Sequence, residues 1–270
     1  MNGKQIRLSR LFDGGNAVVV AIDHGEFDGP IAGMEVLPET AQRIDPAVSA
    51  VLISPGMLTH CASLYTGRVA PIAMVRLNWS TVYAFHWGYH EADTVRAITV
   101  TDAVAAGADC VLASLTLCTG SEARDAANVR VFCDAAAEAR TLGIPLVGEC
   151  FPPDVDKLTP KQLHDQVFRG TRILAELGAD LIKTFRTMDF ASVTRSCPVP
   201  VLGLGAEKTP TQLDALRLAQ CIVDEGGRGV VFGRNAIQVR EPQRFQRALI
   251  DVVRQGMNAD EAVKQHQLVD

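Results

Sequence analysis

The stretch "LAELGADLIKTF" (residues 174–185) carries the chain out of a helix and into a short strand, and it sets the pattern for the fold. Its first half suits a helix that ends at Gly178, because glycine often follows the last residue of a helix. Its second half, "DLIKTF" (180–185), is a short apolar run around one lysine, as expected of a buried parallel strand. The unit predicted here is a helix, a glycine and a buried strand.

Short runs of this kind recur eight times along the chain. They are "AVVVAID" (17–23), "SAVLIS" (49–54), "PIAMVRL" (71–77), "DCVLASL" (109–115), "PLVGECF" (145–151), "DLIKTF" (180–185), "PVLGLG" (200–205) and "GVVFGR" (229–234). Helical stretches with start or stop signals lie between several of them, at 99–108, 129–144, 161–179 and 209–227. Eight strands that alternate with helices predict an α/β fold, a single (β/α)8 TIM barrel.

The chain length and the lack of a linker favour one domain. With 270 residues and 47% hydrophobic content, the chain can bury a large core. No low-complexity segment interrupts it, so we expect one barrel domain over residues 1–270. A doubly wound sheet is the alternative, but it needs a topological switch and usually has fewer strands.

Composition argues against several classes of protein. The net charge is −5 and there is no basic run, which argues against a nucleic-acid partner. No apolar stretch reaches membrane-spanning length, and the first residues lack the apolar core of a signal peptide. The seven cysteines and six histidines are dispersed without a metal-binding spacing. We therefore expect a cytoplasmic protein with reduced cysteines, no bound metal and no membrane partner.

Lys183 stands in the middle of an apolar strand. Lysine is rarely buried, because removing the ammonium group from water is costly. One interpretation is a side chain that reaches the surface from a strand end. The other is an amine kept neutral by Leu181, Ile182 and Phe185, able to attack a ketone or aldehyde and form a Schiff base.

Further polar residues are predicted to gather around Lys183, since active sites of these barrels lie at the carboxyl ends of the strands. Asp23 and His24 follow the first strand, and Glu149 ends the fifth; all three are candidates for proton transfer. Arg76 ends the third strand, and it is a candidate for a second cation near the lysine or for a substrate contact. The alternative is structural: Asp-His-Gly as a simple strand exit, and Glu149 with Arg76 as an ion pair.

The ends of the seventh and eighth strands have the features of a phosphate site. In "GVVFGRNAIQ" (229–238), Gly233 allows close approach of a ligand, Arg234 can bind an oxyanion, and the residues that follow can begin a short helix. Gly203 and Gly205 supply the matching flexible loop after the seventh strand, and Ala206 is a further candidate for substrate binding. We expect the substrate to carry an anionic group, most simply phosphate.

Three stretches together resemble a known family: "AIDHGEFDGP" (21–30), residues 178–210 and residues 229–238. They are similar to the class I (Schiff-base) aldolase superfamily of archaeal-type fructose-bisphosphate aldolase, deoxyribose-phosphate aldolase and aminodideoxyheptulosonate synthase. Within it, the chain is most similar to the branch of autoinducer-2 degradation thiolases, which act on 3-hydroxy-5-phosphonooxypentane-2,4-dione.

The resemblance implies roles for individual residues. Lys183 matches the Schiff-base lysine, Asp23 the catalytic aspartate of the aldolases, and His24 the adjacent histidine implicated in the thiolase. Phosphate-binding positions of the family match Gly205, Gly233 and Arg234. The resemblance also implies a homo-oligomer, such as a ring, and no cofactor, with coenzyme A as a co-substrate only for a thiolase.

The sequence departs from the family at two positions. The tyrosine acid/base expected at the end of the fifth strand is replaced by Phe151, which cannot transfer a proton. Glu207 stands in the loop after the seventh strand, where its charge opposes that of a phosphate.

The function predicted from the sequence is a class I aldolase acting through Lys183 on a small, phosphorylated ketose or diketone. The alternatives are acyl transfer from a phosphorylated diketone to coenzyme A, and a non-catalytic sugar-phosphate-binding barrel. A metal-dependent aldolase would need clustered histidine and carboxylate ligands, which the dispersed histidines do not suggest.

Overall fold

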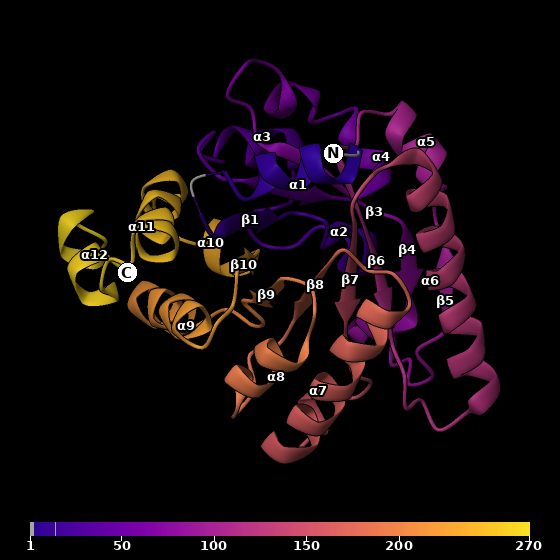
Figure 1. Cartoon of the computed structure of the whole chain (residues 1–270). Helices are drawn as coiled ribbons and strands as arrows, with labels where there is room; N and C mark the ends of the chain where they lie inside the picture. The colour runs from indigo at the N-terminus through magenta and orange to yellow at the C-terminus, as the bar shows by residue number, and fades with distance from the viewer. Residues whose placement is uncertain (1–2, 14) are drawn as a thin grey trace.

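The computed structural model describes residues 3–13 and 15–270, and its centre is a closed barrel of parallel strands (Figure 1). The strands in chain order are β1 (Ala17–Ala21), β2 (Ala50–Ile53), β3 (Ile72–Arg76), β6 (Cys110–Leu115), β7 (Leu146–Cys150), β8 (Leu181–Thr184), β9 (Val201–Leu204) and β10 (Gly229–Phe232). Each lies within one of the eight predicted runs. The ladder closes because β1 pairs with both β2 and β10, which excludes the doubly wound alternative. The predicted (β/α)8 barrel is confirmed.

Successive side chains of each strand point alternately towards the helices and towards the barrel interior, so they belong to two core clusters. Outward-facing residues such as Val18, Val20 and Ile182 pack beneath the helices. Inward-facing residues include one from the middle of each strand, and we call this set the apolar layer. The apolar layer consists of Val19, Leu52, Met74, Leu112, Val147, Leu181, Leu202 and Val231.

Towards the carboxyl ends of the strands, four buried side chains of the barrel interior are charged. They belong to Asp23, Arg76, Glu149 and Lys183, and we call them the charged layer. Glu149 and Lys183 are direct partners in the register between β7 and β8. The strand pattern therefore brings these four predicted residues to the carboxyl end of one barrel.

Helices surround the strands, as Figure 1 shows. They are α1 (Gly3–Leu11), α2 (Gly25–Asp28), α3 (Leu37–Gln42), α4 (Pro55–Leu58), α5 (Val100–Ala105), α6 (Glu122–Leu142), α7 (Pro160–Glu176), α8 (Phe190–Ser196), α9 (Gln212–Asp224), α10 (Arg234–Ile237), α11 (Pro242–Gln255) and α12 (Ala259–Gln265). The four predicted helical stretches correspond to α5, α6, α7 and α9. Helix α6 begins earlier than the predicted 129, because the side chain of Ser121 caps it by accepting a hydrogen bond from the Arg124 backbone N–H.

Helix α1 lies across the amino ends of three strands. Lys4 forms an ion pair with Asp180, just before β8, and Arg10 with Asp109, just before β6. Leu11 is buried in the same core cluster as the apolar layer. This helix therefore closes the end of the barrel opposite to the charged layer.

A small hairpin interrupts the barrel between β3 and β6. It pairs β4 (Asn78–Ser80) with β5 (Thr94–Arg96) in antiparallel fashion, and residues 81–93 form the connection between them. The connection includes the single turns η2 (Thr81–Tyr83) and η3 (Phe85–Trp87). The hairpin was not predicted, and it places aromatic residues over the carboxyl end of the barrel.

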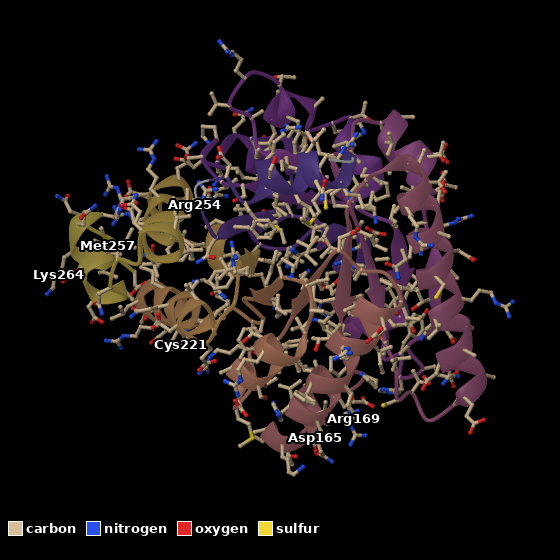
Figure 2. The ribbon with its side chains drawn as sticks, in the orientation of Figure 1. Asp165, Arg169, Cys221, Arg254, Met257 and Lys264 are labelled. Carbon is tan, nitrogen blue, oxygen red and sulfur yellow. The ribbon has the colours of Figure 1, made fainter. Side chains whose placement is uncertain are left out.

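The outer faces of the helices carry polar side chains. Figure 2 shows Asp165 and Arg169 on α7 and Lys264 on α12 at the periphery of the molecule. No helix within residues 3–13 and 15–270 is both long and apolar enough to span a bilayer.

Candidate active site

The four residues of the charged layer form one continuous network of ion pairs. Lys183 Nζ lies 2.5 Å from Glu149 Oε1, and the other carboxylate oxygen of Glu149 accepts a hydrogen bond from Arg76 Nη2 at 2.7 Å. Arg76 Nε donates to Asp23 Oδ2 at 2.6 Å. The side chain of Lys183 is only 9% exposed, and that of Glu149 only 1%. Two buried cations are thus neutralised by two buried carboxylates.

The network keeps both carboxyl groups ionised. Burial by itself would raise the pKa of Asp23, but the positive charges of Arg76 and Lys183 outweigh it and hold the pKa at about 2. Burial likewise opposes ionisation of Glu149, and the same two cations hold its pKa below the usual value. At neutral pH, Asp23 and Glu149 therefore carry negative charge and have no proton to donate.

Arg76 lies at the end of the third strand, as predicted, and is a second cation in the network that contains Lys183. Its side chain is 2% exposed and does not line the cavity described below, so the geometry gives no support to a substrate contact. Its guanidinium group is bound by two carboxylates and lies 5.1 Å from the ring centres of both Phe27 and Tyr83. The alternative interpretation of Arg76 and Glu149 as an ion pair is the one that the structure supports.

A cavity of about 450 Å³ opens above the charged layer. Lys183, Glu149, Asp23 and His24 contribute to its wall. The loops after β9 and β10 also line it, and they contribute Gly205, Ala206, Glu207, Gly233 and Arg234. The structure therefore places all the predicted site residues except Arg76 around one cavity.

His24 immediately precedes α2 and is partly buried. Burial lowers its pKa below the ordinary value, and the positive charges of Lys183 and Arg234 add to this, so the imidazole is neutral at pH 7. Its Nδ1 lies 4.0 Å from Asp23 Oδ1 and has no hydrogen-bond partner in the described part of the chain. Gly233 packs against the ring so closely that a Cβ there would lie 2.2 Å from His24 Cε1.

The predicted anion site is present in a modified form. Arg234 Nη2 donates to the carbonyl oxygen of Ala206, while its Nε is buried without a hydrogen-bond partner among the described residues. The predicted short helix is α10, which begins at Arg234. Gly205 differs from the prediction, because its backbone N–H donates to the carbonyl of Val231 at 3.1 Å and is not available to a ligand.

Asn235 fixes the loop after β9. Its side-chain amide donates to the carbonyl oxygens of Gly205 and Glu207, both at 2.9 Å, and its side-chain oxygen accepts from the Thr209 backbone N–H. In this loop Ala206 has a left-handed φ of 50°. The side chain of Glu207 is exposed at the cavity wall, so the carboxylate that opposes a phosphate remains there.

An aromatic wall, consisting of Phe27, Tyr83, Phe151 and Phe185, forms one side of the cavity. Consecutive ring centres lie 4.6, 4.4 and 5.0 Å apart in that order. Phe151 is indeed at the end of β7, where the family tyrosine was expected. The sequence analysis missed Tyr83, since no motif surrounds it and only the unpredicted hairpin brings it here.

Glu26, on α2, is a second residue that the sequence analysis missed. Both of its carboxylate oxygens are buried with no hydrogen-bond partner in residues 3–13 and 15–270. Burial raises the pKa of Glu26 to about 8, although the charge of Arg76 acts in the opposite direction. In the sequence, its position directly after Asp-His-Gly could have indicated that Glu26 lies near the site.

Known proteins are similar to this chain over almost its whole length. An uncharacterized aldolase of Saccharolobus solfataricus is 32% identical, with 98% of this chain and 99% of that protein covered. A 3-hydroxy-5-phosphonooxypentane-2,4-dione thiolase of Escherichia coli is 28% identical over 96% of this chain and 85% of that protein.

Solved structures agree with these relatives. An archaeal fructose 1,6-bisphosphate aldolase superposes with a TM-score of 0.78 at 27% identity, over 93% of this chain and 99% of that one. Another archaeal fructose-1,6-bisphosphate aldolase, with its catalytic lysine covalently bound to the carbinolamine intermediate, gives a TM-score of 0.77 at 27% identity, over 92% and 98% of the two chains. The family model described as DeoC/LacD family aldolase matches residues 17–239. This chain belongs to the DeoC/LacD family of aldolases.

Proposed function

We propose that the protein is a class I aldolase that breaks or forms a carbon–carbon bond through a Schiff base on Lys183. The substrate would be a small ketose or diketone that carries a phosphate group. The observation that supports this most directly is the position of Lys183 Nζ, at the wall of a cavity and 2.5 Å from a carboxylate oxygen of Glu149.

The ion pair gives the amine a route to its reactive form. An ammonium group is not nucleophilic, so Lys183 must lose a proton before it attacks a carbonyl carbon. Glu149 is in hydrogen-bond contact with Lys183 and can accept that proton. The iminium cation that follows withdraws electrons from the adjacent bond, and Asp23 would stabilise its positive charge from the same layer.

The part of the cavity wall formed by the loops after β9 and β10 suits the anionic end of the substrate. Arg234 has a buried Nε without a partner among the described residues, and it can donate to a phosphate oxygen. This arrangement holds the substrate at one end while the carbonyl group reaches Lys183. The proposed reaction uses no cofactor.

A thiolase-like reaction is the second candidate, and His24 is the observation that favours it. The imidazole is neutral and lines the cavity beside Asp23. A base that activates a thiol would need both properties. Coenzyme A would then enter as a co-substrate and receive an acyl group. Turnover that depends on coenzyme A would separate this reaction from aldol cleavage.

The proposal is tested by trapping the covalent adduct. The protein is incubated with a panel of phosphorylated ketoses and diketones, reduced with sodium borohydride and analysed by peptide mass spectrometry. We expect added mass on a peptide that contains Lys183, no adduct in Lys183→Ala, and turnover lower by at least about 10³-fold in that variant. Lys264→Ala, on the outer helix α12, is the matched control.

Two outcomes would contradict the proposal. Activity that survives in Lys183→Ala would remove the Schiff-base mechanism. Activity lost on treatment with EDTA and restored by zinc would indicate a metal-dependent aldolase, because an iminium ion needs no Lewis acid.

A further inference from the structure

Formation of a Schiff base at Lys183 requires a group that delivers a proton to the carbonyl oxygen of the substrate. Condensation of an amine with a ketone expels the carbonyl oxygen as water, and that oxygen must be protonated before it leaves. Asp23 and Glu149 are both ionised by the surrounding cations. His24 is neutral, because burial lowers its pKa. In the resting site none of these three groups has an acidic proton to give, which points to another group on the cavity wall.

Tyr83 lies on that wall with its hydroxyl group unused. Its side chain is buried, and the hydroxyl oxygen makes no hydrogen bond of good geometry among the described residues, although Ser114 and Glu149 lie next to it. The neighbouring Ser114 is occupied by Asn78, whose Nδ2 donates to Ser114 Oγ at 3.1 Å. An unpartnered buried hydroxyl is costly, so its place beside the cavity calls for a ligand that completes it.

The Tyr83 hydroxyl is also kept in its protonated form. Burial raises the pKa of the phenol well above its ordinary value, and the negative charge of Glu149 raises it further, against the opposing effect of Arg76. At neutral pH the Tyr83 hydroxyl is therefore protonated, whereas the carboxyl groups of Asp23 and Glu149 are ionised. Its hydroxyl group lies next to the carboxylate of Glu149, which in turn contacts Lys183.

The backbone and the rings around Tyr83 hold it in this position. The Ser80 side chain accepts from the Val82 backbone N–H at the start of the turn, and the Thr81 N–H donates to the carbonyl of Asp93 across the hairpin. The Tyr83 ring packs 4.4 Å from that of Phe151. A residue positioned so firmly can transfer a proton without a search for the right geometry.

We propose that Tyr83 is the general acid of the reaction, and that it supplies from the β4–β5 hairpin the hydroxyl group that Phe151 lacks at the end of β7. This assignment rests on the proposed Schiff-base function. The rings of Tyr83 and Phe151 are in contact and line the same cavity. The hydroxyl group of Tyr83 thus takes the place of the one missing at residue 151, but it comes from the connection between β4 and β5.

The protons balance without any external donor. Lys183 gives a proton to Glu149 and its amine adds to the ketone carbon, while the carbonyl π electrons move to oxygen, which takes the proton of Tyr83. Glu149 returns its proton to the tyrosinate. The nitrogen then gives a second proton to Glu149, and Tyr83 protonates the hydroxyl group of the carbinolamine. Water leaves as the C–O bond breaks and the nitrogen lone pair forms the C=N bond, and Glu149 again returns its proton to the tyrosinate. The products are the iminium ion and one water, with Glu149 and Tyr83 back in their starting states.

The test measures the rate at which the adduct forms. The protein is mixed with fructose 1,6-bisphosphate or dihydroxyacetone phosphate, quenched with borohydride at set times, and the modified Lys183 peptide is quantified. Tyr83→Phe keeps the ring and removes the hydroxyl, so adduct formation should slow by about 10²-fold or more. Tyr89→Phe, an exposed tyrosine of the same hairpin, is the matched control and should react at the wild-type rate.

The double variant Tyr83→Phe/Phe151→Tyr moves the hydroxyl group to the neighbouring ring. It contains the same atoms as the wild type, and it should recover at least about tenfold of the lost rate if the hydroxyl acts as an acid. Equal rates in the wild type and Tyr83→Phe would overturn the role of Tyr83 and leave the Schiff base intact. No adduct in the wild type with these probes or with any other ketose or diketone of the panel would remove the proposed function, and the role of Tyr83 with it.

Discussion

The apolar layer and the charged layer of the barrel interior are built on the same strands, yet they are stabilised in opposite ways. In β8, Leu181 is in the apolar layer and Lys183, two residues later, is in the charged layer. The apolar layer gains free energy from removing hydrocarbon from water. The charged layer loses free energy by desolvation and recovers it only through pairing.

The difference shows how stability and chemistry are separated along one strand. Charges held close together in a buried site keep their strength, because little water screens them. The closed end of the barrel, beneath α1, can therefore be optimised for packing while the open end keeps reactive groups. Variants in the two layers should accordingly change different measurements.

The largest expected effect is on stability, from the apolar layer. Leu112→Ala leaves a cavity in a fully buried position and should lower the free energy of unfolding by about 2–5 kcal/mol. Turnover per folded molecule should be unchanged. Chemical denaturation measures the free energy of unfolding, and active-site titration measures the turnover per folded molecule. The exposed Leu142→Ala is the control. A fall in turnover equal to that of a charged-layer variant would contradict the separation.

Next in size is the effect of removing one charge from the charged layer. Glu149→Gln keeps the shape of the side chain but can no longer accept a proton from Lys183, so turnover should fall by about 10²-fold. Steady-state kinetics check this against Glu176→Gln, a carboxylate paired with Arg172 on the surface. Normal turnover in Glu149→Gln would leave His24 or Asp23 as the proton carrier.

A smaller effect is expected beyond the charged layer, at the anion side of the cavity. A charge-assisted hydrogen bond is worth about 1.5–3 kcal/mol, so Arg234→Ala should lower kcat/KM for the phosphorylated substrate about 10- to 150-fold. The unphosphorylated form should be affected little, and Arg240→Ala serves as an exposed control. If both forms react equally and neither responds to Arg234→Ala, the site does not bind phosphate.

The smallest effect concerns Glu26, an acid near the charged layer without a partner among the described residues. Its pKa is raised to about 8, so the folded protein retains a proton that the unfolded chain has lost above about pH 4.5. The stability that this provides is complete below pH 4.5 and is lost as the pH rises through 8.

Glu26→Gln should therefore match the wild type in acid and be more stable at pH 9. We expect a gain of about 1–2 kcal/mol, less than the full pKa shift would give, because the side chain is partly exposed. Thermal unfolding across pH 4–9 measures it. An advantage that is greatest at low pH would show that the carboxyl group is stabilised as an anion.

The strands and the charged layer could be predicted because both follow from local sequence. Buried parallel strands are apolar runs, and residues that end such runs must meet at one end of a closed barrel. This brought Asp23, Glu149 and Lys183 together correctly. The ion pair of Arg76 with Glu149 was one of two interpretations, and the sequence could not decide between it and a substrate contact, because that depends on side-chain directions inside the barrel.

Tyr83 escaped prediction for a different reason. It belongs to an irregular connection, and its contact with Phe151 exists only after the β4–β5 hairpin has folded over the barrel. The backbone N–H of Gly205 was misjudged because the ladder to Val231 continues one residue past the strand. The expected cytoplasmic location and homo-oligomer stay predictions.

The contact between Gly233 and His24 has a consequence for engineering this barrel towards new substrates. Since a methyl group at 233 would overlap the imidazole, mutagenesis of that position alone samples variants in which the histidine is displaced. A smaller residue at 24 would not by itself make room, because the same methyl group would also lie 2.9 Å from the backbone carbonyl oxygen of Ala21, so a library should vary residue 24 and keep Gly233.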